Sequence, residues 1–205
     1  TSQVTILLML AVLLGRRKGL SVLDAKKHIE QLKNLPSLAE ECLSVPYLRQ
    51  FELAAAKYRD KKKFIFLGRQ TMYPIALEAA LKLKEISYLD AQGYAAGEFK
   101  HGPLALIDKD CVCVYFATQD ELVEKNISNI QEIKARGGLV IIVKQKKQDF
   151  PSELYDSVIE IPNCSSLVQP VLSIIPLQYF AMFIALMLEL DVDKPRNLAK
   201  SVTVE

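Results

Sequence analysis

The stretch KKKFIFLGR, residues 61–69, has the composition of a buried strand that enters a loop. Its apolar residues are consecutive, and a short apolar run of this length is typical of a strand inside a protein core. Gly68 ends the run, and glycine at such a position indicates a loop. From Tyr73 to Tyr88 the apolar residues recur at helical spacing instead. The stretch and the segment after it therefore predict a strand followed by a helix.

Three further apolar runs continue this alternation downstream. They are CVCVYFA at 111–117, LVIIVK at 139–144 and SVIEIP at 157–162. A helix is predicted over 121–136, where Gly137 and Gly138 provide a stop, and a long apolar helix over 167–190. Strands that alternate with helices predict an α/β fold, a doubly wound parallel sheet with helices on both faces. Such sheets bind ligands beyond the carboxyl ends of their strands.

Residues upstream of the first strand predict helices. An apolar helix covers Val4–Leu14, and a polar one covers Asp24–Lys33. Proline suits the first turn of a helix, so Pro36 is expected to begin a third helix, and Pro46 a fourth that runs towards Asp60. These segments are expected as extra helices ahead of the sheet.

Composition argues against several kinds of partner. The formal net charge of +2 and the isoelectric point of about 8.2 predict no strong field for nucleic acid or an anionic membrane. The apolar run Val4–Leu14 is too short to cross a bilayer. The four cysteines lack zinc-site spacing, and Cys111 and Cys113 would share one face of a strand. We therefore expect no metal, and free buried thiols in a reducing cytoplasm.

Glu78, Lys82 and Glu85 form one narrow stripe on the helix expected over 73–88, because they lie at i, i+4 and i+7. The rest of that helix is mostly apolar, so the stripe either meets solvent or lines a polar cavity. A carboxylate beside apolar walls would be a useful base near neutral pH. An ordinary ladder of Glu–Lys pairs explains the same spacing, at about 0.2–0.5 kcal/mol a pair. Spacing alone favours the ladder.

Two other residues could carry chemistry. His101 lies in AAGEFKHGP at 95–103, where the flanking glycines suggest a loop that approaches something closely. Histidine is the side chain best suited to proton transfer at neutral pH, although a loop histidine without a role is the default interpretation. Lys200 lies in NLAKSVTVE at 197–205. A partly desolvated lysine forms Schiff bases with carbonyls, but a solvated tail lysine explains the pattern equally well.

ALEAALKLKEISYLDAQGYAAGEFKHGPLALID at 76–108 and DVDKPRNLAKSVTVE at 191–205 resemble the isomerase half of the glutamine:fructose-6-phosphate aminotransferase (glucosamine-6-phosphate synthase) family. The resemblance covers essentially the whole chain. It implies an N-terminal glutaminase domain and two flavodoxin-like sugar isomerase (SIS) subdomains. Residues 1–45 would then be the last helices of a first SIS subdomain and a connector, residues 46–190 the second SIS subdomain, and residues 191–205 a C-terminal tail with a reactive lysine.

The resemblance also implies an activity: formation of glucosamine 6-phosphate from fructose 6-phosphate and glutamine-derived ammonia, without an organic cofactor. Glu85 would be the base that moves a proton between C1 and C2. His101 would help open the sugar ring in the neighbouring subunit of a homodimer, and Lys200 would form a Schiff base with the open-chain ketose. Three more positions would bind the substrate or orient the base: Glu78, Lys82 and Ala199.

Several family parts are absent from the sequence. The glutaminase domain and the first SIS subdomain, with its phosphate-binding loop, are missing, and GRQT at 68–71 departs from the glycine-richer form of the family. We therefore expect that the chain alone makes no glucosamine 6-phosphate, and that it self-associates. Alternatives are a non-catalytic phosphosugar-binding SIS module, a ketose–aldose isomerase without amination, and a structural α/β subunit.

Overall fold

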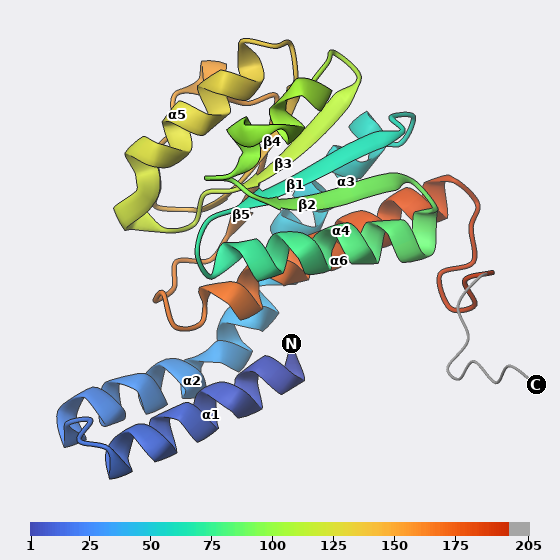
Figure 1. Cartoon of the computed structure of the whole chain (residues 1–205). Coiled ribbons are helices and arrows are strands. Elements are labelled where there is room, and N and C mark those ends of the chain that lie inside the picture. Colours follow the sequence, from blue (N-terminus) through green and yellow to red (C-terminus); the bar gives the residue numbers. More distant parts are fainter. Residues whose placement is uncertain (197–205) are drawn as a thin grey trace, which may run out of the picture.

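A computed structural model describes residues 1–196, and its centre is one five-stranded parallel sheet (Figure 1). The strands lie in the order β2-β1-β3-β4-β5. Their bounds are β1 Lys63–Gly68, β2 Asp90–Ala95, β3 Cys111–Phe116, β4 Leu139–Gln145 and β5 Ser157–Ile161. This order is that of flavodoxin-like doubly wound sheets, in which the switch point lies between β1 and β3. The predicted fold class is confirmed.

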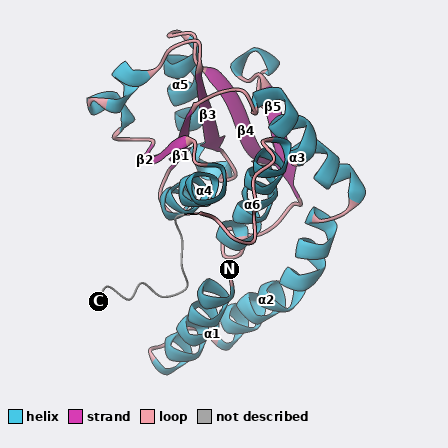
Figure 2. Ribbon diagram, turned by 90° about the vertical axis from the view of Figure 1, so that its right-hand side faces the viewer, coloured by secondary structure: helices cyan, strands magenta, loops and turns pink. Residues whose placement is uncertain are grey.

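The helices lie on both faces of the sheet and beyond it (Figure 2). They are α1 Ser2–Arg17, α2 Val22–Cys42, α3 Val45–Tyr58, α4 Met72–Ser87, α5 Val123–Lys134 and α6 Gln169–Met187, with the short 3₁₀ turns η1 Phe99–His101, η2 Pro103–Leu106, η3 Asp120–Leu122 and η4 Ser152–Leu154. α4 links β1 to β2, and α5 links β3 to β4, so each returns the chain to the amino edge of the sheet.

Alternate residues of β1 enter two separate cores. Phe64 and Phe66 pack with the apolar faces of α3, α4 and α6 on one side of the sheet. Ile65 and Leu67 pack on the other side with α5 and with the segment 96–107. Because both faces are covered, the side chains of β1 and β3 are buried almost completely, which explains why their sequences are continuously apolar.

The helix α6 is long and apolar enough to cross a membrane by length and composition, with a mean hydropathy of 1.8. Its residues Phe180, Ala181 and Ile184 are fully buried, however, and belong to the core shared with α3 and α4. Core helices commonly show this composition, because an all-round apolar helix is one that neighbours cover on several sides.

Two local predictions were incomplete or wrong. β2 was not predicted, because it is an edge strand whose Asp90 and Gln92 are exposed and whose interior contains Gly93. Pro36 does not begin a helix but lies inside α2, which is continuous from Val22 to Cys42. Proline removes one backbone hydrogen bond, and the flanking turns of this long helix are retained. Pro46, in contrast, lies in the first turn of α3 as predicted.

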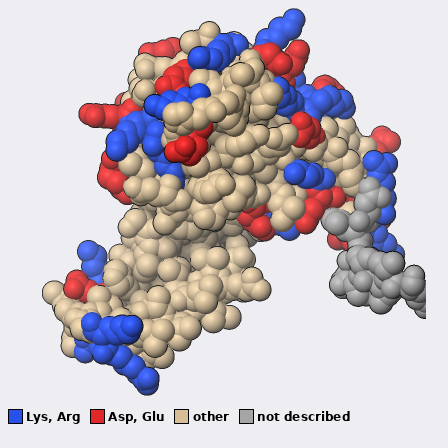
Figure 3. All heavy atoms as spheres, viewed as in Figure 1, with Lys and Arg blue, Asp and Glu red and all other residues tan. Residues whose placement is uncertain are grey.

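The α1–α2 hairpin, residues 2–42, differs from the rest of the molecule in its surface. It projects from the sheet domain, and its visible face is largely uncharged apart from a basic tip (Figure 3). Leu7, Leu10 and Leu14 are 62%, 45% and 46% exposed, although they lie on one face of α1. Only Val12 of α1 is buried. An apolar helix face of this size indicates a surface that normally contacts another protein surface.

Candidate functional site

The predicted polar stripe on α4 is formed as expected. Lys82 lies between the two carboxylates, with its Nζ 2.7 Å from Oε2 of Glu85 and 3.8 Å from Oε1 of Glu78. The side chains of Glu78, Lys82 and Glu85 are 45%, 34% and 25% exposed, so the stripe is neither buried nor fully solvated. On the opposite faces of the same helix, Ala76, Ala79 and Leu83 are buried in the core.

The charges of the stripe reinforce one another. The hydrogen bond that Lys82 donates to Glu85 raises the pKa of Lys82, partial burial lowers it, and the charges of Glu85 and Glu78 raise it further. Lys82 is therefore cationic at neutral pH and holds the Glu85 carboxylate in one place by a charge-assisted hydrogen bond. A carboxylate fixed in this way at the rim of an apolar helix face has the geometry of a positioned base.

A cavity of about 260 Å³ adjoins the stripe at Glu78, the residue of the stripe that lies nearest the amino end of α4. Glu78 and Ile75 of α4 line one wall, and Val171 and Gln178 of α6 line another. The first turn of α1 closes the cavity through Val4. The carboxylate of Glu78 thus faces a small space that is bounded by apolar residues and by the amide of Gln178, which is where a polar substrate could meet the stripe.

Arg196, the last described residue, contacts the residue that ends α4, three residues after Glu85. Tyr88 ends the helix in a left-handed conformation, with φ of 61°. Its hydroxyl accepts a hydrogen bond from the backbone N–H of Arg196 at 2.8 Å, and the Arg196 guanidinium lies 4.2 Å from the centre of the Tyr88 ring. A cation over an aromatic ring is attracted by the ring quadrupole. Sequence reasoning missed this contact, and Lys200 and Ala199 lie outside the described residues.

His101 lies elsewhere. It is exposed at the end of η1, in the connection from β2 to β3. Phe99 and Leu104 anchor this connection in the core on the face of the sheet opposite to α4. Within residues 1–196 no hydrogen bond or ion pair joins His101 to the stripe, and the connection that carries His101 packs on the other face of the sheet from α4.

The four cysteines are free, and Cys111 and Cys113 are buried side by side on one face of β3, as predicted. Among residues 1–196, no group of three or more His, Cys, Asp or Glu side chains is arranged to hold a metal ion.

Curated relatives match this chain along its full length. The glutamine–fructose-6-phosphate aminotransferases (isomerizing) of Salmonella typhi and Escherichia coli K12 are 48% and 47% identical over all 205 residues. The chain spans about a third of the length of these relatives, since the match covers 33% of each. The chain thus corresponds to one part of each of these relatives.

Solved structures and a protein family also match this chain. The C-terminal domain of glucosamine-fructose-6-phosphate aminotransferase from Francisella tularensis is 38% identical, with a TM-score of 0.78 over 85% of this chain and 49% of that one. Glucosamine-6-phosphate deaminase from Thermotoga maritima shares the fold, with a TM-score of 0.67 at 21% identity over 99% of this chain and 56% of that one. The SIS domain family matches residues 57–188. The chain therefore belongs to the SIS domain family.

Proposed function

We propose that this chain is the C-terminal isomerase part of a glutamine–fructose-6-phosphate aminotransferase, and that its α4 stripe carries the base of the reaction. The observation that supports this most directly is the fixed Lys82–Glu85 pair, on a stripe whose Glu78 lines a cavity, in a chain 48% identical to named aminotransferases. The substrates would be fructose 6-phosphate and ammonia derived from glutamine, and the product glucosamine 6-phosphate.

The proposed mechanism assigns one role to each group. The amine of Lys200 attacks C2 of the open-chain ketose, and loss of water gives an imine. Ammonia then adds to C2 and displaces the amine of Lys200, which leaves a C2 imine of ammonia whose protonated form accepts the electron pair released at C1. Glu85 removes a proton from C1 and returns it at C2, which converts the ketose skeleton into an aldose skeleton. Lys82 and Glu78 position the Glu85 carboxylate. Ala199, beside the reactive lysine, would contribute a substrate contact.

The Tyr88–Arg196 contact supports the assignment of Lys200. Arg196 is held by Tyr88, the residue that directly follows α4, and it lies four residues before Lys200 in the sequence. Four residues of extended chain span at most about 14 Å. The contact therefore holds Arg196, at the start of the tail, near the carboxyl end of α4. Glu85 lies at the same end, which is where the imine would have to form.

The separation of His101 from the stripe favours a composite site. Because one sheet lies between the face of His101 and the face of α4, a site that uses both residues needs two chains. We propose a homodimer in which His101 of one subunit opens the sugar ring bound at the α4 stripe of its neighbour. The cytoplasm would be the compartment, in keeping with the free cysteines.

The apolar face of α1 supports the proposed domain boundaries. Residues 1–45 would be the last helices of a first SIS subdomain and a connector, and residues 46–190 the second SIS subdomain. The remaining length of the relatives would supply the glutaminase domain and the phosphate-binding loop. In that arrangement Leu7, Leu10 and Leu14 would pack inside the first subdomain.

The test is Glu85→Gln in the full-length protein, with Glu52→Gln on the exposed face of α3 as the matched control. We expect Glu85→Gln to lower the rate of glucosamine 6-phosphate formation by about 10²–10⁴-fold, because it removes the base but leaves the shape. Glutamine hydrolysis and the circular dichroism spectrum should not change. Full turnover in Glu85→Gln would contradict the proposal and leave the non-catalytic phosphosugar-binding module as the better interpretation.

The 205-residue chain alone should form no glucosamine 6-phosphate from fructose 6-phosphate and ammonium, because the proposed phosphate site lies outside it. Coupled detection of the product at high enzyme concentration checks this. Turnover by the purified chain would show that the site is complete without the rest of the protein.

A further inference from the structure

Tyr88 holds the chain at the point where the C-terminal tail begins. Its hydroxyl accepts a hydrogen bond from the backbone N–H of Arg196 at 2.8 Å, and the centre of its ring lies 4.2 Å from the guanidinium carbon of Arg196. Tyr88 is half-buried, whereas Arg196 is exposed. One side chain at the edge of the fold therefore binds both the backbone and the side chain of a residue that is distant in the sequence.

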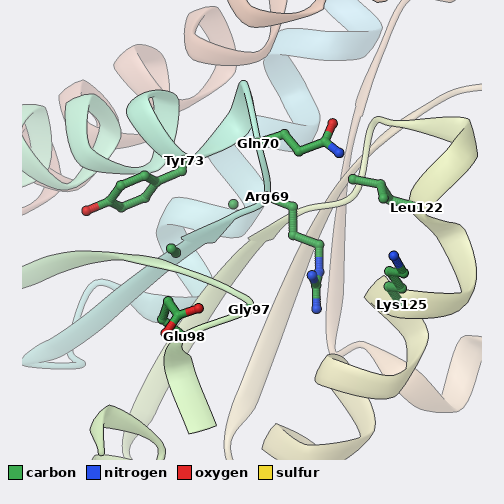
Figure 4. Close-up of a pocket in the computed structure, with 9 residues that line it drawn as sticks. Arg69, Gln70, Tyr73, Gly97, Glu98, Leu122 and Lys125 are labelled. Atoms are coloured by element: carbon green, nitrogen blue, oxygen red, sulfur yellow. The ribbon is translucent and has the colours of Figure 1, made fainter. Parts of the chain in front are cut away.

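The contact lies far from the edge of the sheet where such folds usually bind ligands. That carboxyl edge has a cavity of about 280 Å³, whose lining includes Arg69, Tyr73 and Lys125 (Figure 4). Tyr88 follows Tyr73 by fifteen residues, which is about 22 Å along the axis of α4. Glu85, in contrast, is only three residues before Tyr88, about one helical turn away. The contact therefore belongs with the carboxyl end of the polar stripe and not with this cavity.

Packing in the core does not explain why a tyrosine ends α4. Among the described residues, Tyr88 belongs to neither of the two apolar cores. Its φ of 61° is left-handed, and helices that end in this conformation usually have glycine there, because glycine adopts it without strain. A large side chain at such a strained position indicates a role that compensates for the strain. The contact with Arg196 is such a role.

The chain between α6 and Arg196 contains two turns that lead it to Tyr88. Glu189, just after α6, is left-handed with φ of 58°, which turns the chain away from the helix axis. Oδ1 of Asp191 then accepts hydrogen bonds from the backbone N–H groups two and three residues later, at 2.9 and 3.0 Å. Both turns use local contacts only, so neither ties the chain to the sheet domain. Tyr88 supplies that connection.

We propose that Tyr88 is a positioning residue, which holds Arg196 so that Lys200 acts from a short tether. The inference rests on the function proposed above, in which Lys200 forms the imine. With Tyr88 in place, the tether from Arg196 to Lys200 is four residues long. Without it, the tether starts at the end of α6, thirteen residues before Lys200. The effective concentration of a tethered group falls roughly as the −3/2 power of tether length, so that of the amine falls about sixfold.

The experiment traps the imine in the full-length protein, with saturating fructose 6-phosphate and without glutamine or ammonia. Cyanoborohydride delivers a hydride to the imine carbon and leaves a stable secondary amine on the lysine, which mass spectrometry assigns and quantifies. Tyr88→Leu should lower the rate of trapping at Lys200 by about sixfold. Tyr88→Phe keeps the ring beside Arg196 but lacks the hydroxyl, so its rate should lie between those of Tyr88→Leu and the parent. Tyr155→Phe, at a half-buried tyrosine before β5, is the matched control and should be trapped like the parent.

Tyr88→Gly separates positioning from folding. Glycine suits the left-handed backbone, so the melting temperature should stay equal or rise, while trapping at Lys200 should fall as in Tyr88→Leu. Glutamine hydrolysis should be unchanged in every variant. The role of Tyr88 is overturned if Tyr88→Leu and Tyr88→Gly are trapped like the parent, or if trapping falls only as far as the melting temperature does. An absence of trapping at Lys200 in the parent protein would instead contradict the proposed imine, and the role of Tyr88 with it.

Discussion

The sheet domain and the α1–α2 hairpin are both rich in apolar residues, but they use them differently. In the sheet domain, Phe66 of β1 and Phe180 of α6 are fully buried between layers. In the hairpin, Leu7 and Leu14 of α1 are exposed although they are equally apolar. The difference shows that the apolar character of a side chain does not by itself determine whether that side chain is buried or how much it stabilises the fold. A partner surface is needed, and within residues 1–196 only the sheet domain provides one for each of its faces.

The largest expected effect is in the sheet domain. Phe66→Ala should lower the free energy of unfolding by about 3–5 kcal/mol, because it leaves a cavity between β1 and the helices on that face. Urea denaturation followed by circular dichroism measures it. Leu53→Ala on α3 is the control, since Leu53 is 57% exposed and should change stability by about 0.5 kcal/mol or less. Equal losses of unfolding free energy in the two variants would show that burial does not distinguish these two apolar side chains.

A second measurement reports on the junction between the two regions. Cys42 ends α2 and is fully buried, and burial raises the pKa of its thiol from 9.0 to about 12. At pH 8 alkylation of Cys42 should therefore be at least about a thousandfold slower than in the unfolded chain, because the thiolate is the nucleophile. Mass spectrometry of time points assigns the site. Fast labelling of Cys42 in the folded chain would show that the end of α2 detaches from the core.

The same thiols predict a pH dependence. Burial also raises the pKa of Cys164 to about 12, so Cys42 and Cys164 release their protons in the unfolded chain before they do so in the folded one. Stability should therefore decrease as the pH rises from about 9 towards 12, because the folded state binds more protons over that range. Urea midpoints at pH 8 and pH 10 test this. A double Cys42→Ala, Cys164→Ala variant should show a weaker dependence.

The smallest effect on stability is expected in the hairpin. Leu7→Lys combined with Leu14→Lys should change the free energy of unfolding by about 0.5 kcal/mol or less, because both side chains are already exposed. The same double variant should turn a self-associating chain into a monomer, which light scattering detects. A monomeric parent chain, or a large loss of stability in the double variant, would show that the α1 face is not an unused contact surface.

Prediction from the sequence worked where local pattern and tertiary environment agree. β1, β3 and β4 were predictable because strands buried on both faces are continuously apolar. β5 was predictable from its short run of Val158, Ile159 and Ile161, although it is an edge strand. β2 was not, because its edge position tolerates polar residues and its Gly93 is required by contact with α4. A Cβ at Gly93 would lie 2.9 Å from Cα of Leu77. That requirement exists only once the helix packs on the strand.

The candidate site also combines features that a local sequence pattern predicts with features that it does not predict. The spacing of Glu78, Lys82 and Glu85 along one helix placed them on one face, since helical periodicity depends only on local geometry. The contact between Tyr88 and Arg196 joins residues 108 positions apart, and no local pattern encodes it. The roles of His101, Lys200 and Ala199 came from the family resemblance, and they remain proposals.

The sequence by itself determined the α/β class, four of the five strands, the polar stripe and the resemblance to an aminotransferase family, because these depend on short-range periodicity and on motifs. Only the tertiary structure decided that Glu85 and His101 lie on opposite faces of the sheet, that Arg69 and Lys125 converge on one cavity, and that the apolar face of α1 is exposed. The physical reason is that burial, charge pairing and convergence depend on which surfaces meet, and contacts between distant residues are established only when the chain folds.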